Sequence, residues 1–175
     1  MRETNKEQVD CASREDGISG ICSHKQTELV LEVAKYIVSE MSKAGKPVNI
    51  FVLQDMLYYT QQTCIELFGH PAFLEDFEVR IYGLTLRSVG REYCMFGAYP
   101  IYREHVLDPL SPHVKEAAGM AMNKYGNTIH FHVIHSYMDD EDHPWTRAQK
   151  AECLTVTEMD IREYLRRKRE RMWNE

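Results

Sequence analysis

The sequence lacks any long run of apolar residues. Even its longest uninterrupted apolar stretches are short, as at Ile50 to Leu53. A membrane-spanning helix needs roughly 20 apolar residues in succession. We therefore expect no membrane contact. The first seven residues also lack the apolar core of a secretory signal, and we expect a cytoplasmic protein.

Catalytic signatures are also missing. The chain contains no G-x-S-x-G elbow, no Walker A loop and no G-x-G-x-x-G turn, which would indicate a hydrolase, an NTPase or a dinucleotide-binding protein. The chain therefore carries no signature of these classes, and a Cys–His pair for nucleophilic catalysis is the alternative that stays open. No two of the five cysteines form a C-x-x-C pair, and their odd number favours free thiols over a disulfide framework or a zinc ribbon.

The composition is that of one ordinary globular domain. The chain has 175 residues, of which 43% are hydrophobic and 27% charged, and a chain of this length can bury a sizeable core. The formal net charge is −6. A negatively charged protein repels the phosphates of nucleic acid. We therefore expect no sequence-specific nucleic-acid binding by this chain alone.

Apolar residues recur with the 3.6-residue period of a helix through most of the chain after residue 25. Gly-Lys-Pro at 45–47 and Gly-His-Pro at 69–71 are typical helix ends. Asn49 and Ser111 are typical helix N-caps, and Pro112 suits a first helical position. The predicted helices are residues 26–44, 49–68, 86–96, 112–125, 128–137 and 145–151, with a last helix capped by Thr157 and Asp160.

Two short segments favour strands instead. Phe77, Val79 and Ile81 alternate with polar residues, which is the period-two pattern of a strand. Residues 99–102 predict a second strand. The expected fold is therefore mainly α, in the α+β class: a single compact helical domain over residues 25–175 with a small antiparallel β element. Residues 1–24 are polar and lack periodicity, and we expect a flexible N-terminal lead.

Histidines suggest a metal site as one alternative. His130, His132 and His135 lie within six residues of one another, and His143 follows. Histidine is a common metal ligand, so these side chains could bind zinc or nickel, in a metal-binding module or in a metal-dependent enzyme. On a helix, however, His130 and His132 would point to different faces. Ordinary packing and hydrogen bonding of these histidines is the competing interpretation.

Two charged runs are the next candidates. Residues 139–142 are acidic, without the glycine and terminal glutamate of an EF-hand loop. They could form a solvated turn or contact a basic protein. Residues 166–171 are mostly basic, which suits the C-terminal end of a helix. They could be solvated, contact an acidic partner or contact phosphates.

Large aromatic residues could serve either in the core or in a binding surface. Tyr58 and Tyr59 are consecutive in a predicted helix, so one ring can enter the core while the other lies at its rim. Tyr82 beside Gly83 and Trp145 after Pro144 are similar cases. Tyrosine and tryptophan are enriched at binding hot spots, and they are equally what a small helical core needs.

The order of several motifs resembles a known family. A helix with Val-Ala-Lys-Tyr-Ile at 33–37 precedes Leu-Gln-Asp-Met-Leu-Tyr-Tyr-Thr-Gln at 53–61, then Phe-Glu-Val-Arg-Ile-Tyr-Gly at 77–83 and a helix ending at Phe-Gly, 96–97. Lys-Tyr-Gly at 124–126, His135, Pro144-Trp145 with Arg147-Ala148, and Ile161-x-x-Tyr164 follow. In this order, the chain resembles the Panacea domain of phage-associated, SocA-like antitoxins from residue 29 to residue 165. Val52 and Asp55 replace lysines that the family usually carries, and we expect these changes in surface or recognition segments.

The resemblance implies a non-enzymatic protein that neutralises a cognate toxin by direct contact, with no catalytic residues and no cofactor. It also implies an association with prophages or other mobile elements. One kind of family member acts instead as a proteolytic adaptor that delivers its toxin to a AAA+ protease. Residues matching the motifs are the partner-binding candidates: Tyr58, Tyr59, Gln61, Tyr82, Gly83, Pro144, Trp145 and Arg147.

Overall fold

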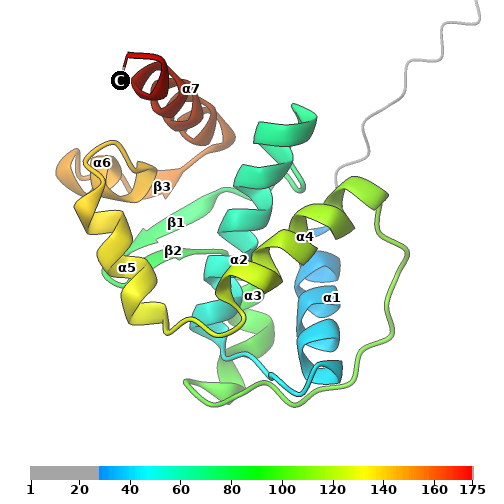
Figure 1. Cartoon of the computed structure of the whole chain (residues 1–175). Helices are drawn as coiled ribbons and strands as arrows, with labels where there is room; N and C mark the ends of the chain where they lie inside the picture. The colour runs from blue at the N-terminus through cyan, green and yellow to red at the C-terminus, as the bar shows by residue number, and fades with distance from the viewer. Residues whose placement is uncertain (1–27, 175) are drawn as a thin grey trace, which may run out of the picture.

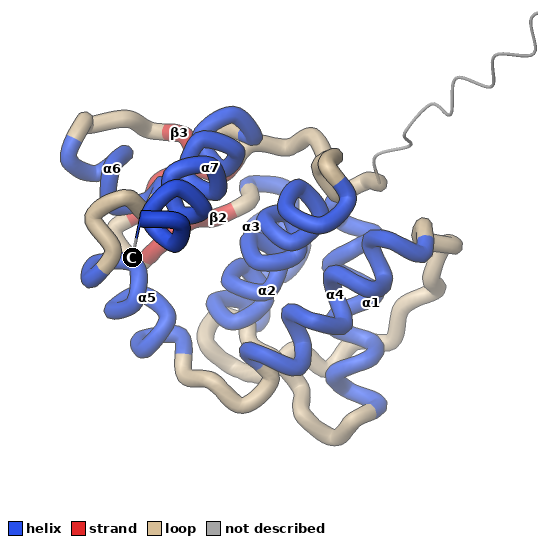
Figure 2. Tube along the Cα trace, turned by 45° about the horizontal axis from the view of Figure 1, so that its top comes forward, coloured by secondary structure: helices blue, strands red, loops and turns tan. Residues whose placement is uncertain are grey.

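The computed structural model describes residues 28–174, so the predicted N-terminal lead lies outside the described residues. Within this range the chain is mainly helical with one small antiparallel sheet, which confirms the predicted fold class. Figures 1 and 2 show α1 to α4 on one side of the molecule and the sheet with α5, α6 and α7 on the other. The elements are α1 Val30–Lys43, α2 Ile50–Thr63, β1 Phe77–Arg80, β2 Gly83–Thr85, α3 Arg87–Tyr93, α4 Pro112–Tyr125, α5 His130–Asp139, α6 Pro144–Lys150, β3 Thr155–Val156 and α7 Glu158–Asn174.

Helix α2 is the centre of the fold and contacts α1, α3, α4, α5 and β2. Its N-terminus is capped as predicted, because the Asn49 side chain accepts a hydrogen bond from the Val52 N–H at 3.0 Å. A short π-helix, Cys64–Phe68, extends α2. Gly69 then ends the helix with a φ of 74°, a conformation that glycine adopts without a steric penalty.

The sheet has the strand order β2-β1-β3, and both pairs are antiparallel. Arg80 pairs with Gly83, so residues 81 and 82 form the tight turn of the β1–β2 hairpin. The predicted strand at 99–102 is wrong. Those residues lie outside any strand, and Ile101 instead donates one backbone hydrogen bond to Val48 in another loop.

One continuous cluster of buried side chains forms the core. Its fully buried side chains come from the apolar stripes of α1, α2 and α4 and from the inner face of the sheet. The start of α7 is capped as predicted, since the Asp160 carboxylate accepts hydrogen bonds from the Thr157 N–H and hydroxyl at 2.8 and 2.7 Å. None of the helices within residues 28–174 is long and apolar enough to span a membrane.

Candidate functional site

Most of the predicted partner-binding residues lie in the interior rather than on the surface. Burial on all sides of α2 and along the inner side of α6 accounts for this, and in this conformation these side chains hold the fold together. The buried residues are Tyr58, Gln61, Gly83, Pro144 and Trp145.

Two buried glutamines on α2, Gln54 and Gln61, illustrate the structural role of the buried motif residues. The Gln61 side chain accepts a hydrogen bond from the Ala72 N–H at 2.8 Å and donates one to the Phe73 carbonyl at 3.0 Å. Gln54 accepts from the Leu86 N–H at 2.8 Å. Each glutamine therefore satisfies loop backbone groups that would otherwise be buried without partners. The two glutamines of the motif fasten loops to the central helix.

Trp145 has a comparable role in α6. Its side chain is 5% exposed, and the indole N–H donates to the Arg80 carbonyl at 2.8 Å. The ring thus fastens α6 to the end of β1. Substituting Trp145 would disturb the fold, so this residue is unsuitable for mapping a partner surface.

The other three predicted contact residues remain accessible. Arg147 is exposed on α6, and Tyr82 is 67% exposed in the hairpin turn. Tyr59 is half-buried, where its ring packs edge-on against Tyr125 and beneath the Lys124 ammonium, 4.1 Å from the ring centroid. The expectation that one of the paired tyrosines enters the core and the other reaches its rim is confirmed, with Tyr58 inside.

Tyr82 belongs to a wider group of exposed apolar side chains that we call the hairpin surface. Its members come from the start of α2, from the hairpin turn and from the start of α5. His130 links them: its ring stacks on Phe51 with centroids 5.2 Å apart and binds the Tyr82 carbonyl, while two exposed members are its neighbours in sequence. The hairpin surface consists of Phe51, Ile81, Tyr82, Ile129 and Phe131.

An acid–histidine pair, with Asp55 buried and His130 half-buried, supports the hairpin surface from below. His130 Nδ1 lies 2.7 Å from the Asp55 carboxylate and its Nε2 lies 3.0 Å from the Tyr82 carbonyl oxygen. Because an ionised carboxylate and a carbonyl only accept hydrogen bonds, this arrangement suits a protonated imidazole that donates from both nitrogens. The hairpin turn is thereby tied to both α5 and α2.

The pKa values of this pair follow from its burial. Burial raises the pKa of Asp55 to about 6, and the hydrogen bond from His130 and its positive charge oppose the rise. For His130, burial lowers the pKa, but the hydrogen bond to Asp55, the negative charge of Asp55 and the bond to the Tyr82 carbonyl outweigh it and leave the pKa raised. Asp55 is buried, so the expectation that it lies in a surface segment is wrong.

The histidines of the alternative metal hypothesis are not brought together. His132 and His135 are exposed on α5, whereas His143 is buried and stacks on Tyr137 with ring centroids 3.9 Å apart. His143 also caps α6, since its Nδ1 accepts from the Trp145 N–H at 3.2 Å. Within residues 28–174, no three His, Cys, Asp or Glu side chains are placed together to hold a metal ion.

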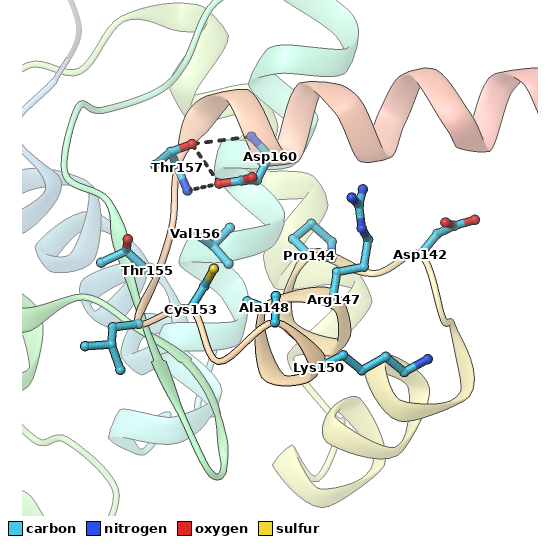
Figure 3. Close-up of a pocket in the computed structure, with 12 residues that line it drawn as sticks. Asp142, Pro144, Arg147, Ala148, Lys150, Cys153, Thr155, Val156, Thr157 and Asp160 are labelled. Carbon is cyan, nitrogen blue, oxygen red and sulfur yellow. Dashed lines mark hydrogen bonds between the residues drawn. The ribbon is translucent and has the colours of Figure 1, made fainter.

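A groove of about 660 Å³ lies between α6, β3 and the start of α7, and Figure 3 shows the residues that line it. Arg147 and Lys150 extend from α6, and Val156 points toward Pro144 and Ala148. Arg147 makes no ion pair with any residue that the structure describes, and the Asp160 carboxylate, which also lines the groove, accepts hydrogen bonds from Thr157. Two of the predicted contact residues, Pro144 and Arg147, line this groove together with the carboxylates of Asp142 and Asp160.

Sequence reasoning missed Asp55 and His130 as partners, although it named both residues separately. They lie 75 positions apart, and the periodicity of apolar residues shows only which residues of one helix or strand share a face. It cannot show that residues of two separate helices are in contact. The one available signal was the acidic residue within an otherwise apolar part of α2, because a buried carboxylate requires a partner.

The fold and the hairpin surface define a small, mainly helical α+β protein with exposed apolar and cationic features. Comparison with protein-family models, with curated proteins and with solved structures finds no match to this chain.

Proposed function

We propose that this chain is a non-enzymatic protein-binding domain that acts as the antitoxin of a toxin–antitoxin pair. It would bind its cognate toxin in the cytoplasm by direct contact through the hairpin surface. The resemblance to Panacea-domain antitoxins suggests this kind of partner. Delivery of the toxin to a AAA+ protease is the adaptor form of the same proposal, in which binding would precede degradation.

The observation that carries the proposal is the rigid support beneath an exposed apolar turn. Exposed side chains such as Ile81 and Tyr82 gain nothing from folding while they remain in water. Burying a carboxylate such as Asp55 is costly even when it is paired. A fold that fixes an apolar turn by such a pair presents that turn in one conformation, which reduces the entropy lost when a partner binds.

Growth rescue tests the proposal. The chain is co-expressed with each neighbouring open reading frame, and growth is scored with and without it. We expect one neighbour to be toxic alone and harmless together with this chain. If no neighbour arrests growth, or if the chain rescues none that does, the antitoxin proposal is wrong.

A matched pair of variants tests the surface. Tyr82→Ala removes an aromatic ring that is 67% exposed on the hairpin surface, and Tyr99→Ala removes one that is 79% exposed elsewhere. Loss of a central hot-spot side chain typically weakens binding by about 2 kcal/mol or more. We expect Tyr82→Ala to impair rescue and complex formation with the toxin, and Tyr99→Ala to preserve both. Equal behaviour of the two variants would exclude the hairpin surface.

A further inference from the structure

A second groove borders the hairpin surface and has a different chemical character. It lies between the first turn of α2, the outer face of the β1–β2 hairpin and α3, and its volume is about 430 Å³. Ile50, Phe51 and Leu86 give it an apolar lining. Gly90 of α3 also faces this space, and a Cβ atom added there would meet nothing within 4 Å. We call it the arginine groove.

Three arginines surround this groove: Arg80 at the end of β1, and Arg87 and Arg91 on α3. Glu78 is the one carboxylate in its lining, and both Arg80 and Arg87 form ion pairs with it. Hydrogen bonds from Arg87 and Arg80 lower the pKa of Glu78, so this carboxylate is ionised and already engaged. Arg91 forms no ion pair within residues 28–174. The groove therefore holds an excess of positive charge in a chain whose net charge is −6.

The placement of two of these arginines is unfavourable for the isolated chain. Arg87 and Arg91 are four residues apart on a helix of seven residues, a spacing at which like charges face each other. Glu78 offsets the charge of Arg87, whereas no carboxylate within residues 28–174 offsets that of Arg91. Glu92, the only acidic residue of α3, binds Arg103 instead, at 2.7 Å. An acidic ligand in the groove would relieve this repulsion.

We propose that the arginine groove binds a short acidic segment of a protein partner. An apolar side chain of that segment would cover Ile50 and Phe51, and its carboxylates would contact Arg91 and Arg87. This inference rests on the proposed protein-binding function and adds the chemistry of the partner. The apolar lining by Ile50 and Phe51 favours an acidic protein segment over nucleic acid, which has no aliphatic side chain to bury there.

Peptide pools provide the direct test. The full chain is immobilised and offered a pool of short peptides built from Asp, Glu, Leu and Phe, and a matched pool in which Asn and Gln replace the acids. We expect retention of the acidic pool to exceed that of the amide pool by about tenfold, as expected for about 1.4 kcal/mol of charge-dependent binding, and to fall as salt is added. Equal retention of the two pools would overturn the proposal.

A matched pair of variants locates the binding. Arg91→Gln removes the cation that has no intramolecular partner, and Arg169→Gln removes an exposed arginine of α7 that also forms no ion pair with the described residues. We expect Arg91→Gln to abolish the preference for acidic peptides and Arg169→Gln to retain it. Both positions are exposed, and a thermal melt of each variant confirms folding. The inference fails if Arg91→Gln retains the preference.

Cysteine footprinting gives a second readout that needs no substitution. Cys94 lines the arginine groove, whereas Cys153 is exposed in the other groove. A peptide selected from the acidic pool should slow alkylation of Cys94 and leave that of Cys153 unchanged, as resolved by mass spectrometry. Protection of neither thiol, or of Cys153 alone, would place the peptide elsewhere and refute the assignment.

Two further outcomes separate this inference from alternatives. A single-stranded oligonucleotide that displaces the peptide and binds more tightly would assign the groove to nucleic acid and overturn the proposal. Growth rescue by this chain, together with no preference for acidic peptides, would refute the arginine groove and leave the antitoxin proposal standing. Binding of acidic peptides without any growth rescue would refute the antitoxin proposal and leave the arginine groove standing.

Discussion

Arg171 near the end of α7 lies 2.9 Å from a carboxylate oxygen of Asp142, and its guanidinium also lies 3.4 Å from Asp140. Arg167 contacts Asp142 as well, at 3.5 Å. The acidic run at 139–142 and the basic run at 166–171 therefore meet each other. Each run was expected to contact solvent or a partner, and part of both is instead used to attach α7 to the loop before α6.

The first prediction concerns this attachment. Arg171→Gln should destabilise the protein by about 0.5–1 kcal/mol at low salt, because the ion pairs are partly exposed. The loss should shrink in high salt. Denaturant unfolding at two salt concentrations measures it. Arg169→Gln is the control, and an equal loss in both variants would show that the contacts with Asp140 and Asp142 contribute nothing.

The hairpin turn gives a second prediction. Gly83 has a φ of 112°, and an added Cβ would lie 2.6 Å from the Ile134 Cδ1 atom. Gly83→Ala should therefore cost about 2 kcal/mol, mainly through backbone strain. Gly90→Ala on α3 has open space and an ordinary φ, so it should leave stability unchanged or increase it by up to about 1 kcal/mol. Thermal or denaturant unfolding compares the two, and similar effects would contradict the described turn.

A third prediction concerns acid sensitivity. Burial lowers the pKa of His143 to about 3 from its ordinary value of 6.5, although the Asp140 charge opposes this. Between these two pKa values, His143 is protonated in the unfolded chain and neutral in the folded chain. The free energy of unfolding therefore falls as the pH decreases from 6.5 toward about 3. His143→Asn keeps an N-cap acceptor that does not titrate.

We expect His143→Asn to be less stable than the natural protein at neutral pH, because the stacking on Tyr137 is lost. Its stability should nevertheless depend less on pH between about 6.5 and about 4. Urea unfolding across this range provides the measurement. Parallel pH curves for the two proteins would show that His143 is not the group responsible.

The fourth prediction concerns the pair beneath the hairpin. The pKa of His130 is raised when the protein is folded. The stabilisation by protonated His130 is therefore fully present below pH 6.5, the ordinary pKa of histidine, and is lost as the pH rises through the raised pKa of the folded protein. Burial likewise raises the pKa of Asp55 to about 6 from 3.8, which also makes stability fall as the pH rises. In Asp55→Asn the amide can donate to an unprotonated Nδ1, so the variant should lose little stability as the pH rises from about 6 into the alkaline range.

Unfolding of the natural protein and of Asp55→Asn over that range tests this expectation. The His130 ring protons, followed by NMR, report the titration directly in the natural protein. A His130 pKa below 6.5 in the folded protein would contradict the described pair, whatever the stability curves show.

Local features of the sequence were sufficient for most of the helices. Asn49 caps α2, Pro112 starts α4, and Thr157 with Asp160 caps α7, because such signals act over three or four residues. The strands were harder to predict from the sequence. Residues 77–80 form β1 as the alternation indicated, but its partners are β2 and a two-residue strand, β3, from a distant part of the chain. Segments of two or three residues are too short to show a period.

The sequence by itself determined the fold class, the positions of the helices and the apolar stripes that form the core, since these depend on residue spacing along single elements. Only the tertiary structure decided which candidate residues are accessible. It placed Tyr58 and Trp145 inside and Tyr82 outside, and it joined Asp55 to His130 and Arg171 to Asp142 across long stretches of chain. Burial and pairing depend on how separate elements pack together, and no local pattern carries that information.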